Sequence, residues 1–115
     1  MNSCIALFPG QGSQHIGMGK FLFENFDIAK RVFEEASDSI SVDLKKLCFE
    51  GDEKALALTE NTQPALVTVS TATWRVLNSE CELPISYLAG HSVGEYSALT
   101  AAGVCLLYTS DAADE

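Results

Sequence analysis

The sequence predicts an α/β fold, in which helices join the parallel strands of a sheet. Two short apolar runs, Cys4–Phe8 and Ile85–Ala89, each stop at a turn that contains glycine, as buried strands do. Between them, apolar residues recur at helical spacing over most of the chain. With 115 residues, of which 47% are hydrophobic and 20% charged, the chain has room for one globular domain at most.

The first strand and the loop after it open the chain. We expect Cys4–Phe8 to be a strand that is buried on both faces, because it is uniformly apolar. The segment Pro9–Gly19 carries four glycines among polar residues, so its backbone can adopt conformations closed to other residues. Such a loop can bring main-chain N–H groups close to a ligand.

Three helical segments follow the loop. Asp27 is the predicted N-cap of the first helix, and 42–49 forms a shorter second one. Thr62 is the predicted N-cap of a longer third helix, with Pro64 in its first turn, and a polar loop precedes it. The predicted buried stripes are Ile28, Val32, Phe33, Ala36 and Ile40 in the first helix and Leu66, Val69, Ala72, Thr73 and Val76 in the third.

The turn after the second strand has the pattern of a nucleophile elbow, Gly90-x-Ser92-x-Gly94. A predicted strand precedes this turn and a small-residue helix, 95–102, follows it. The serine of an elbow projects from the edge of the sheet, and the N–H of the next residue, Val93, lies at the helix N-terminus beside any oxyanion that forms. The pattern therefore predicts that Ser92 is a nucleophile.

An oxyanion hole needs a second donor, and the loop after Phe8 would supply it if the two strands are neighbours. The Gly10–Gly12 turn suits that task. The competing interpretation, a phosphate-binding loop, fits poorly, because His15 stands where a dinucleotide fingerprint needs a small residue and Gly19-Lys20 lacks the rest of a P-loop.

Charge and cysteine usage exclude several function classes. Seven Lys and Arg oppose sixteen Asp and Glu, a net charge of −9 that repels nucleic acid and anionic lipid. No apolar run approaches the length that spans a bilayer, and the N-terminus lacks a signal-peptide pattern, so we expect a cytoplasmic protein. The four widely spaced cysteines predict buried free thiols, with no metal or redox site.

Four separated motifs stand out along this sequence. They are Phe8-Pro9-Gly10-Gln11-Gly12-Ser13-Gln14, Gly17-Met18-Gly19, Thr62-Gln63-Pro64-Ala65 and Gly90-His91-Ser92-Val93-Gly94-Glu95-Tyr96-Ser97-Ala98-Leu99. In this order and spacing they resemble the malonyl-CoA:acyl carrier protein transacylase family. The resemblance runs from about Ile5 to Val104 and covers the amino-terminal part of the family's longer catalytic subunit.

The resemblance implies a truncated acyltransferase core with an α/β hydrolase-like parallel sheet. It implies that Ser92 takes a malonyl group from malonyl-CoA and passes it to the phosphopantetheine thiol of acyl carrier protein, with the N–H groups of Gln11 and Val93 holding the oxyanion. No cofactor is expected besides the CoA thioester substrate. We expect His91 to lie near the acyl pocket rather than to act as the base, and place Gln63, Gly10 and Gly12 with it as substrate-binding residues.

The resemblance also implies that this chain is incomplete. The family's activating histidine and its carboxylate-binding arginine lie beyond Glu115, so we expect residues 1–104 to form part of an acyltransferase domain that does not turn over alone. The segment 105–115 does not resemble the family and is interpreted as an atypical tail. Three alternatives stay open: an acyltransferase domain of a polyketide synthase, a serine hydrolase or thioesterase, and a non-catalytic remnant.

Overall fold

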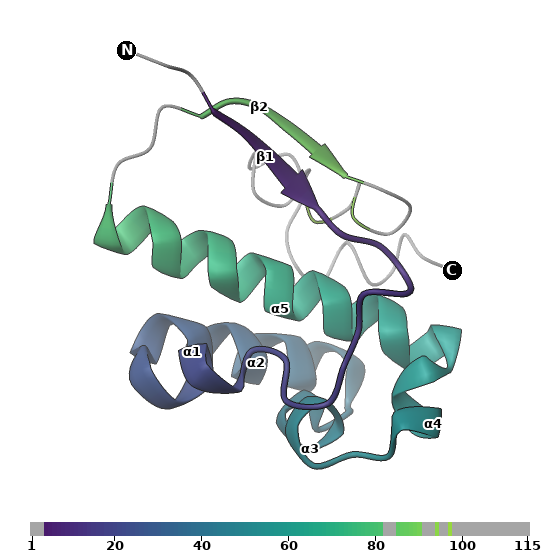
Figure 1. The fold of residues 1–115 in the computed structure, drawn as a ribbon. Helices are drawn as coiled ribbons and strands as arrows, with labels where there is room; N and C mark the ends of the chain where they lie inside the picture. Colours follow the sequence, from purple (N-terminus) through teal and green to yellow (C-terminus); the bar gives the residue numbers. More distant parts are fainter. Residues whose placement is uncertain (1–3, 82–84, 91–93, 95–96, 98–115) are drawn as a thin grey trace.

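The chain folds into three layers in the computed structural model, which describes residues 4–81, 85–90, 94 and 97 (Figure 1). A two-stranded parallel sheet of β1 (Cys4–Phe8) and β2 (Ile85–Gly90) forms the first layer. The long helix α5 (Thr59–Glu80) lies beneath the sheet. The third layer, on the far side of α5, contains α1 (Lys20–Asn25), α2 (Asp27–Ile40) and α3 (Leu44–Phe49), with α4 (Glu53–Ala57) beside the start of α5. The predicted α/β class is thus observed.

The two strands end at the same level. They pair in parallel with Phe8 opposite Gly90, after an irregularity in register between Cys4 and Ile5. The Phe8 ring is buried and packs edge-on against Trp74 of α5, with ring centroids 5.9 Å apart, which holds the sheet on that helix.

The expectation that β1 is buried on both faces is wrong for this chain. Side chains alternate between the two faces of a strand. Ile5 and Leu7, on one face, are 60% and 76% exposed, whereas Phe8, on the other face, is 7% exposed. Among the described residues, no helix covers the outer face, so only the face toward α5 is packed.

The main hydrophobic core lies between α5 and the third layer. Phe23, Phe33 and Phe49 form its aromatic centre, with Phe33 1% exposed and 5.5 Å from Phe23 and 5.3 Å from Phe49 between ring centroids. An ion pair from Arg75 Nη1 to Glu35 Oε2, at 3.5 Å, joins α5 to α2 at the rim. The buried members of the core are Met18, Ala29, Val32, Phe33, Ala36, Leu44, Cys48, Leu56, Ala65, Leu66, Val67, Ala72 and Val76.

The second of the predicted helices corresponds to α3, and the first to α2. Asp43 caps α3 by accepting a hydrogen bond from Lys46 N at 3.1 Å, whereas Asp27 is the first residue of α2 and makes no side-chain cap bond, so its prediction as N-cap is wrong. The predicted stripe of α2 is observed: Val32, Phe33 and Ala36 are buried, and the two isoleucines at its ends pack against the core.

Two local predictions about the next segment are also wrong. The expected polar loop contains α4, which Asp52 caps by accepting from Lys54 N at 2.9 Å. The helix α5 begins at Thr59 rather than after Thr62, so Pro64 lies within it. Thr62 is buried and its hydroxyl donates back to the carbonyls of Leu56 and Leu58, which fastens α4 to α5. Thr73 was predicted to belong to the buried stripe of α5, but it is exposed.

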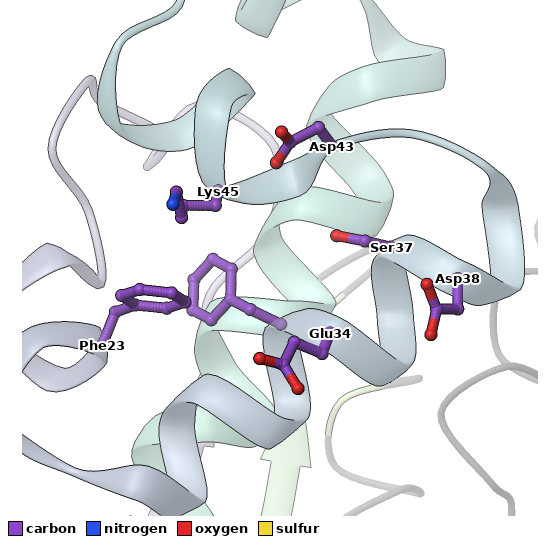
Figure 2. Close-up of a pocket in the computed structure, with 7 residues that line it drawn as sticks. Phe23, Glu34, Ser37, Asp38, Asp43 and Lys45 are labelled. Atoms are coloured by element: carbon purple, nitrogen blue, oxygen red, sulfur yellow. The ribbon is translucent and has the colours of Figure 1, made fainter.

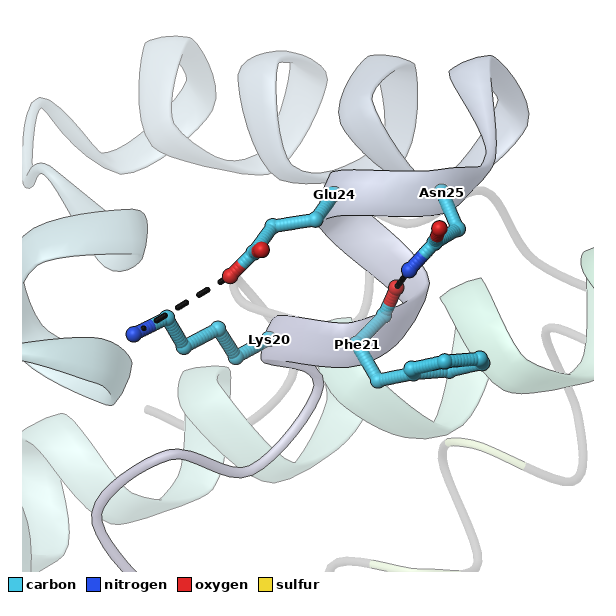
Figure 3. Close-up of polar contacts among 4 residues, drawn as sticks. All are labelled: Lys20, Phe21, Glu24 and Asn25. Carbon is cyan, nitrogen blue, oxygen red and sulfur yellow. Dashed lines mark hydrogen bonds and ion pairs between the residues drawn. The ribbon is translucent and has the colours of Figure 1, made fainter.

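The short helix α1, which was not predicted, is stabilised by bonds along its own surface (Figure 3). Lys20 Nζ lies 3.9 Å from Glu24 Oε1, and Asn25 Nδ2 donates to Phe21 O at 2.8 Å. Exposed pairs of this kind contribute about 0.3–0.5 kcal/mol. The packing of Phe23 on the core therefore holds α1 in place more than its surface contacts do.

The cysteines do not all behave as predicted. Cys48 is a buried free thiol, and burial raises its pKa to about 12. Cys4 and Cys81 are free but exposed, because they lie at the first residue of β1 and just after α5, so the expectation of burial is wrong for both. Cys105 lies outside the described residues.

Candidate active site

The loop after β1 turns sharply at its predicted oxyanion-binding residues. Gly10 is buried, and its carbonyl accepts hydrogen bonds from Ser13 N at 3.3 Å and Ser13 Oγ at 2.8 Å. Gly12 has φ +113°, in the region where a side chain is strained, although a Cβ there would meet nothing within 4 Å. Glycine is therefore needed at position 12 for its backbone conformation and not for space.

The hydrogen bonds described within this loop use the amides of Gly12 and Ser13, and not that of Gln11. The N–H of Gly12 donates to Gln14 Oε1 at 2.7 Å, and the N–H of Ser13 donates to Gly10 O. Within the part of the chain that the structure describes, the N–H of Gln11 makes no hydrogen bond. The loop's own hydrogen bonds thus do not use the amide that the sequence predicts as an oxyanion donor.

Gly94, the second glycine of the predicted elbow, lies against the start of the loop at the carboxyl end of the sheet. Phe8 and Gly90 are opposite each other, so the loop and the elbow leave neighbouring strands at the same edge. Gly94, which is helical and buried, approaches the end of β1 so closely that a Cβ on it would lie 2.8 Å from both Phe8 C and Pro9 O and would overlap Phe8 O. The second glycine of the elbow is required by this approach.

Three predicted site residues lie outside the described part of the chain: His91, Ser92 and Val93. Their described neighbours Gly90 and Gly94 bracket them at the end of β2 and at the start of the following helix. A strand therefore precedes these three positions and a helical residue follows them, as a nucleophile elbow requires. The assignment of these three residues stays a prediction.

Gln63 belongs to α5, one helical turn after Thr59, and is half-buried. Residues separated by four positions share one face of a helix, so Gln63 follows Thr59 on its face. Gln11 reaches that same turn, because its side-chain Nε2 donates to Thr59 Oγ1 at 3.1 Å. The amino-terminal turns of α5 thus lie beside the loop, as a substrate-binding role for Gln63 requires.

Sequence reasoning missed Thr59. Its position in a segment expected to be a loop gave no reason to place it beside Gln11, which is 48 residues away in sequence. A short motif cannot reveal a contact between two segments that only the fold brings together. The nearest signal was the Thr62-Gln63-Pro64 motif, which lies in the same helical turns.

A polar cavity of about 420 Å³ lies elsewhere, between α1, α2 and the start of α3 (Figure 2). Glu34 and Asp38 of α2 and Asp43 border it, and Lys45 Nζ lies 5.5 Å from the centroid of the Phe23 ring. Its described lining includes no residue of the Pro9–Gly19 loop. This cavity is therefore not part of the candidate active site.

A second cavity, of about 470 Å³, is apolar and lies between β1 and α5. It is lined by residues of both elements, among them Ala6, Phe8 and Trp74. None of the described helices is long and apolar enough to cross a membrane.

Comparison with known proteins gives a consistent result along this chain. The profile of the family described as acyl transferase domain matches residues 6–114. A malonyl CoA-acyl carrier protein transacylase of Bacillus subtilis is 57% identical over 104 residues, which are 90% of this chain and 26% of that protein.

Solved structures agree with the sequence comparison. An acyl-carrier-protein S-malonyltransferase from Bartonella henselae superposes with a TM-score of 0.92 at 46% identity, over 96% of this chain and 36% of that one. A malonyl-transacylase solved in complex with a type II polyketide synthase acyl-carrier protein gives a TM-score of 0.91 at 42% identity, over 96% and 36%. The chain spans about a quarter to a third of the length of the proteins it matches.

Proposed function

Because the chain belongs to the acyl transferase domain family, we propose that it carries the nucleophile and the oxyanion hole of a malonyl-CoA:acyl carrier protein transacylase. Its place in metabolism would be fatty-acid synthesis. The substrates are malonyl-CoA and acyl carrier protein, no cofactor takes part, and we expect the protein to act in the cytoplasm without nucleic acid or membrane. We also propose that the sheet belongs to an α/β hydrolase-like core. Residues 1–104 would form part of the acyltransferase domain, and 105–115 would be an atypical tail.

The proposed reaction has two acyl-transfer steps. Ser92 Oγ attacks the thioester carbonyl of malonyl-CoA and loses its proton to a base that the family supplies from beyond Glu115. The oxyanion of the tetrahedral intermediate accepts from the N–H groups of Gln11 and Val93, and its collapse breaks the C–S bond and releases CoA as the thiol after protonation. The thiol of phosphopantetheine then attacks the malonyl-serine ester, and Ser92 regains its proton.

The observation that carries the proposal is the contact between Gly94 and the end of β1. It supports a site in which the N–H of Gln11 and the amide after the nucleophile lie close enough to serve one oxygen atom. Each donor of this kind is commonly worth about 3–4 kcal/mol of barrier, so two of them account for a large share of the rate. Gly10 and Gly12 shape the loop, while His91 and Gln63 are proposed to line the acyl pocket.

The test uses a chimera in which residues 1–104 replace the matching segment of the Bacillus subtilis relative, so that the site is completed. The chimera is mixed with malonyl-CoA, and its peptides are analysed by mass spectrometry. We expect a malonyl adduct on Ser92 that disappears when phosphopantetheinylated acyl carrier protein is added, with malonyl appearing on the carrier. The Ser92→Ala variant should form no adduct.

Two results would contradict the proposal. Release of free malonate without transfer to the carrier would favour the hydrolase or thioesterase alternative. Binding of malonyl-CoA without any adduct, in a chimera that is folded by circular dichroism, would favour the non-catalytic remnant.

A role in polyketide synthesis is the second candidate, because a structural neighbour is a malonyl-transacylase in complex with a polyketide carrier protein. The chemistry at Ser92 is the same in both cases. Transfer rates to a fatty-acid carrier and to a polyketide carrier, measured side by side with the chimera, distinguish them. The fatty-acid assignment requires the faster transfer to go to the fatty-acid carrier.

A further inference from the structure

We propose that Thr59 is a positioning residue for the oxyanion donor Gln11, an inference that rests on the function proposed above. The hydrogen bond from Gln11 Nε2 to Thr59 Oγ1, at 3.1 Å, joins the loop after β1 to the first turn of α5. Gln11 would contribute to the oxyanion hole through its backbone N–H, so its side chain is free to hold the residue in place.

The loop needs such an anchor because its other bonds near Gln11 are local. Gly12 donates to Gln14, and Ser13 donates to Gly10, so these bonds fix the shape of the turn but not its position over the elbow. The second half of the loop is anchored by Gly17 N, which donates to Cys48 O of α3 at 2.7 Å. Among the described residues, the bond to Thr59 is the corresponding anchor of the first half.

Thr59 is a rigid point of attachment. It follows Leu58, whose carbonyl accepts from Thr62 Oγ1 at 2.9 Å and from Asn61 N at 2.8 Å. Asn61 Nδ2 also donates to Ala55 O at 2.9 Å, which ties this turn to α4. The start of α5 is therefore tied to α4, and Gln11 is tethered to a part of the fold outside its own loop.

Loss of the tether should lower the rate of acylation and leave binding of the CoA thioester unchanged. An oxyanion donor acts in the transition state, where a small displacement weakens it. The ground-state complex does not depend on that donor. A purely structural role for Thr59 would instead lower stability and leave the acylation rate of the folded enzyme as it was.

The experiment measures single-turnover acylation of Ser92 by malonyl-CoA in the chimera defined above. For Thr59→Val we expect the acylation rate constant to fall by about three- to tenfold, the malonyl-CoA concentration at half-maximal rate to stay within twofold, and Thr59→Ser to restore the rate. The matched control is Thr73→Val on the same helix. Its exposed hydroxyl donates to Val69 O, at 2.8 Å, within that helix, so its loss should not alter the rate.

The single variant Gln11→Met keeps the test informative if Thr59→Val does not fold. Gln11→Met removes the same bond from the loop side and preserves the backbone N–H, so it should lower the rate as Thr59→Val does, and the double variant should lower it no further. If the acylation rate constant of Gln11→Met, or of a folded Thr59→Val, lies within twofold of that of the unsubstituted chimera, the positioning role of Thr59 is overturned and the proposed function is not. Absence of any acylation in the unsubstituted chimera overturns the proposed function.

Discussion

The contact between Gly94 and the end of β1 makes Gly94→Ala the sharpest perturbation of the site. The new methyl group would lie 2.8 Å from Phe8 C and Pro9 O, where ordinary contact begins at 3.4 Å, and would overlap Phe8 O. The neighbours are backbone atoms that cannot rotate away, so the elbow helix and β1 must separate by at least about 0.6 Å.

Two effects of known size follow from that separation. Overpacking of this kind costs about 1–3 kcal/mol, and we expect the upper half of that range because the obstacle is main chain. In the proposed site the same movement would pull the N–H of Val93 away from that of Gln11, and a misplacement of about 1 Å can cost roughly a hundredfold in rate. The free energy of unfolding should therefore fall by about 2–3 kcal/mol, and kcat/KM of the chimera by about 10- to 100-fold.

Urea denaturation and malonyl transfer by the Gly94→Ala chimera measure the two effects. The control is Gly17→Ala, where φ is +97° and a Cβ would meet nothing within 4 Å. That variant has backbone strain of about 1–2 kcal/mol without a collision, and it should keep most of its activity. The reasoning is refuted if Gly94→Ala is no less stable than Gly17→Ala and transfers malonyl at the unsubstituted rate.

Two further predictions concern the core. Burial raises the pKa of Cys48 from 9.0 to about 12. Between these two pH values the thiol stays protonated in the folded protein and ionises in the unfolded one. The free energy of unfolding should therefore be unaffected below pH 9 and then fall by about 1.4 kcal/mol per pH unit up to pH 12. Urea titrations from pH 8 to 11 check this, and an unchanged slope in Cys48→Ala would contradict it. Phe33→Ala should lower the free energy of unfolding by about 3–5 kcal/mol, because its ring is 1% exposed at the aromatic centre. Phe21→Ala, which removes a ring that is 71% exposed, should lower it by under about 0.5 kcal/mol. Equal urea midpoints for the two variants would disprove the assignment of the core.

The sequence was sufficient for those parts of the fold that depend on local patterns. Short apolar runs predicted both strands. Helical periodicity located α2 and α3 because each buries one clear stripe against the core.

The errors have physical causes outside local sequence. Thr62 has the residue type of an N-cap, but its hydroxyl bonds back to the end of α4, so α5 starts earlier at Thr59. Ile5 and Leu7 look like residues of a fully buried strand, and their exposure depends on what covers the sheet, which β1 itself does not encode.

For the site, the sequence indicated the loop and the elbow separately, and pairing of the strands brought them together. The parallel register of Phe8 with Gly90 depends on packing of both strands over α5 and could only be assumed beforehand. The same holds for the tether from Gln11 to Thr59, since nothing in either segment specifies the other.

The central claim is that the Gln11 loop and the Ser92 elbow serve one oxyanion. The most direct measurement is a crystal structure of the chimera with a malonyl ester trapped on Ser92. We predict that the ester carbonyl oxygen lies about 2.7–3.1 Å from both Gln11 N and Val93 N. An ester oxygen that is bound by Val93 alone, with Gln11 N more than about 4 Å away, would contradict it.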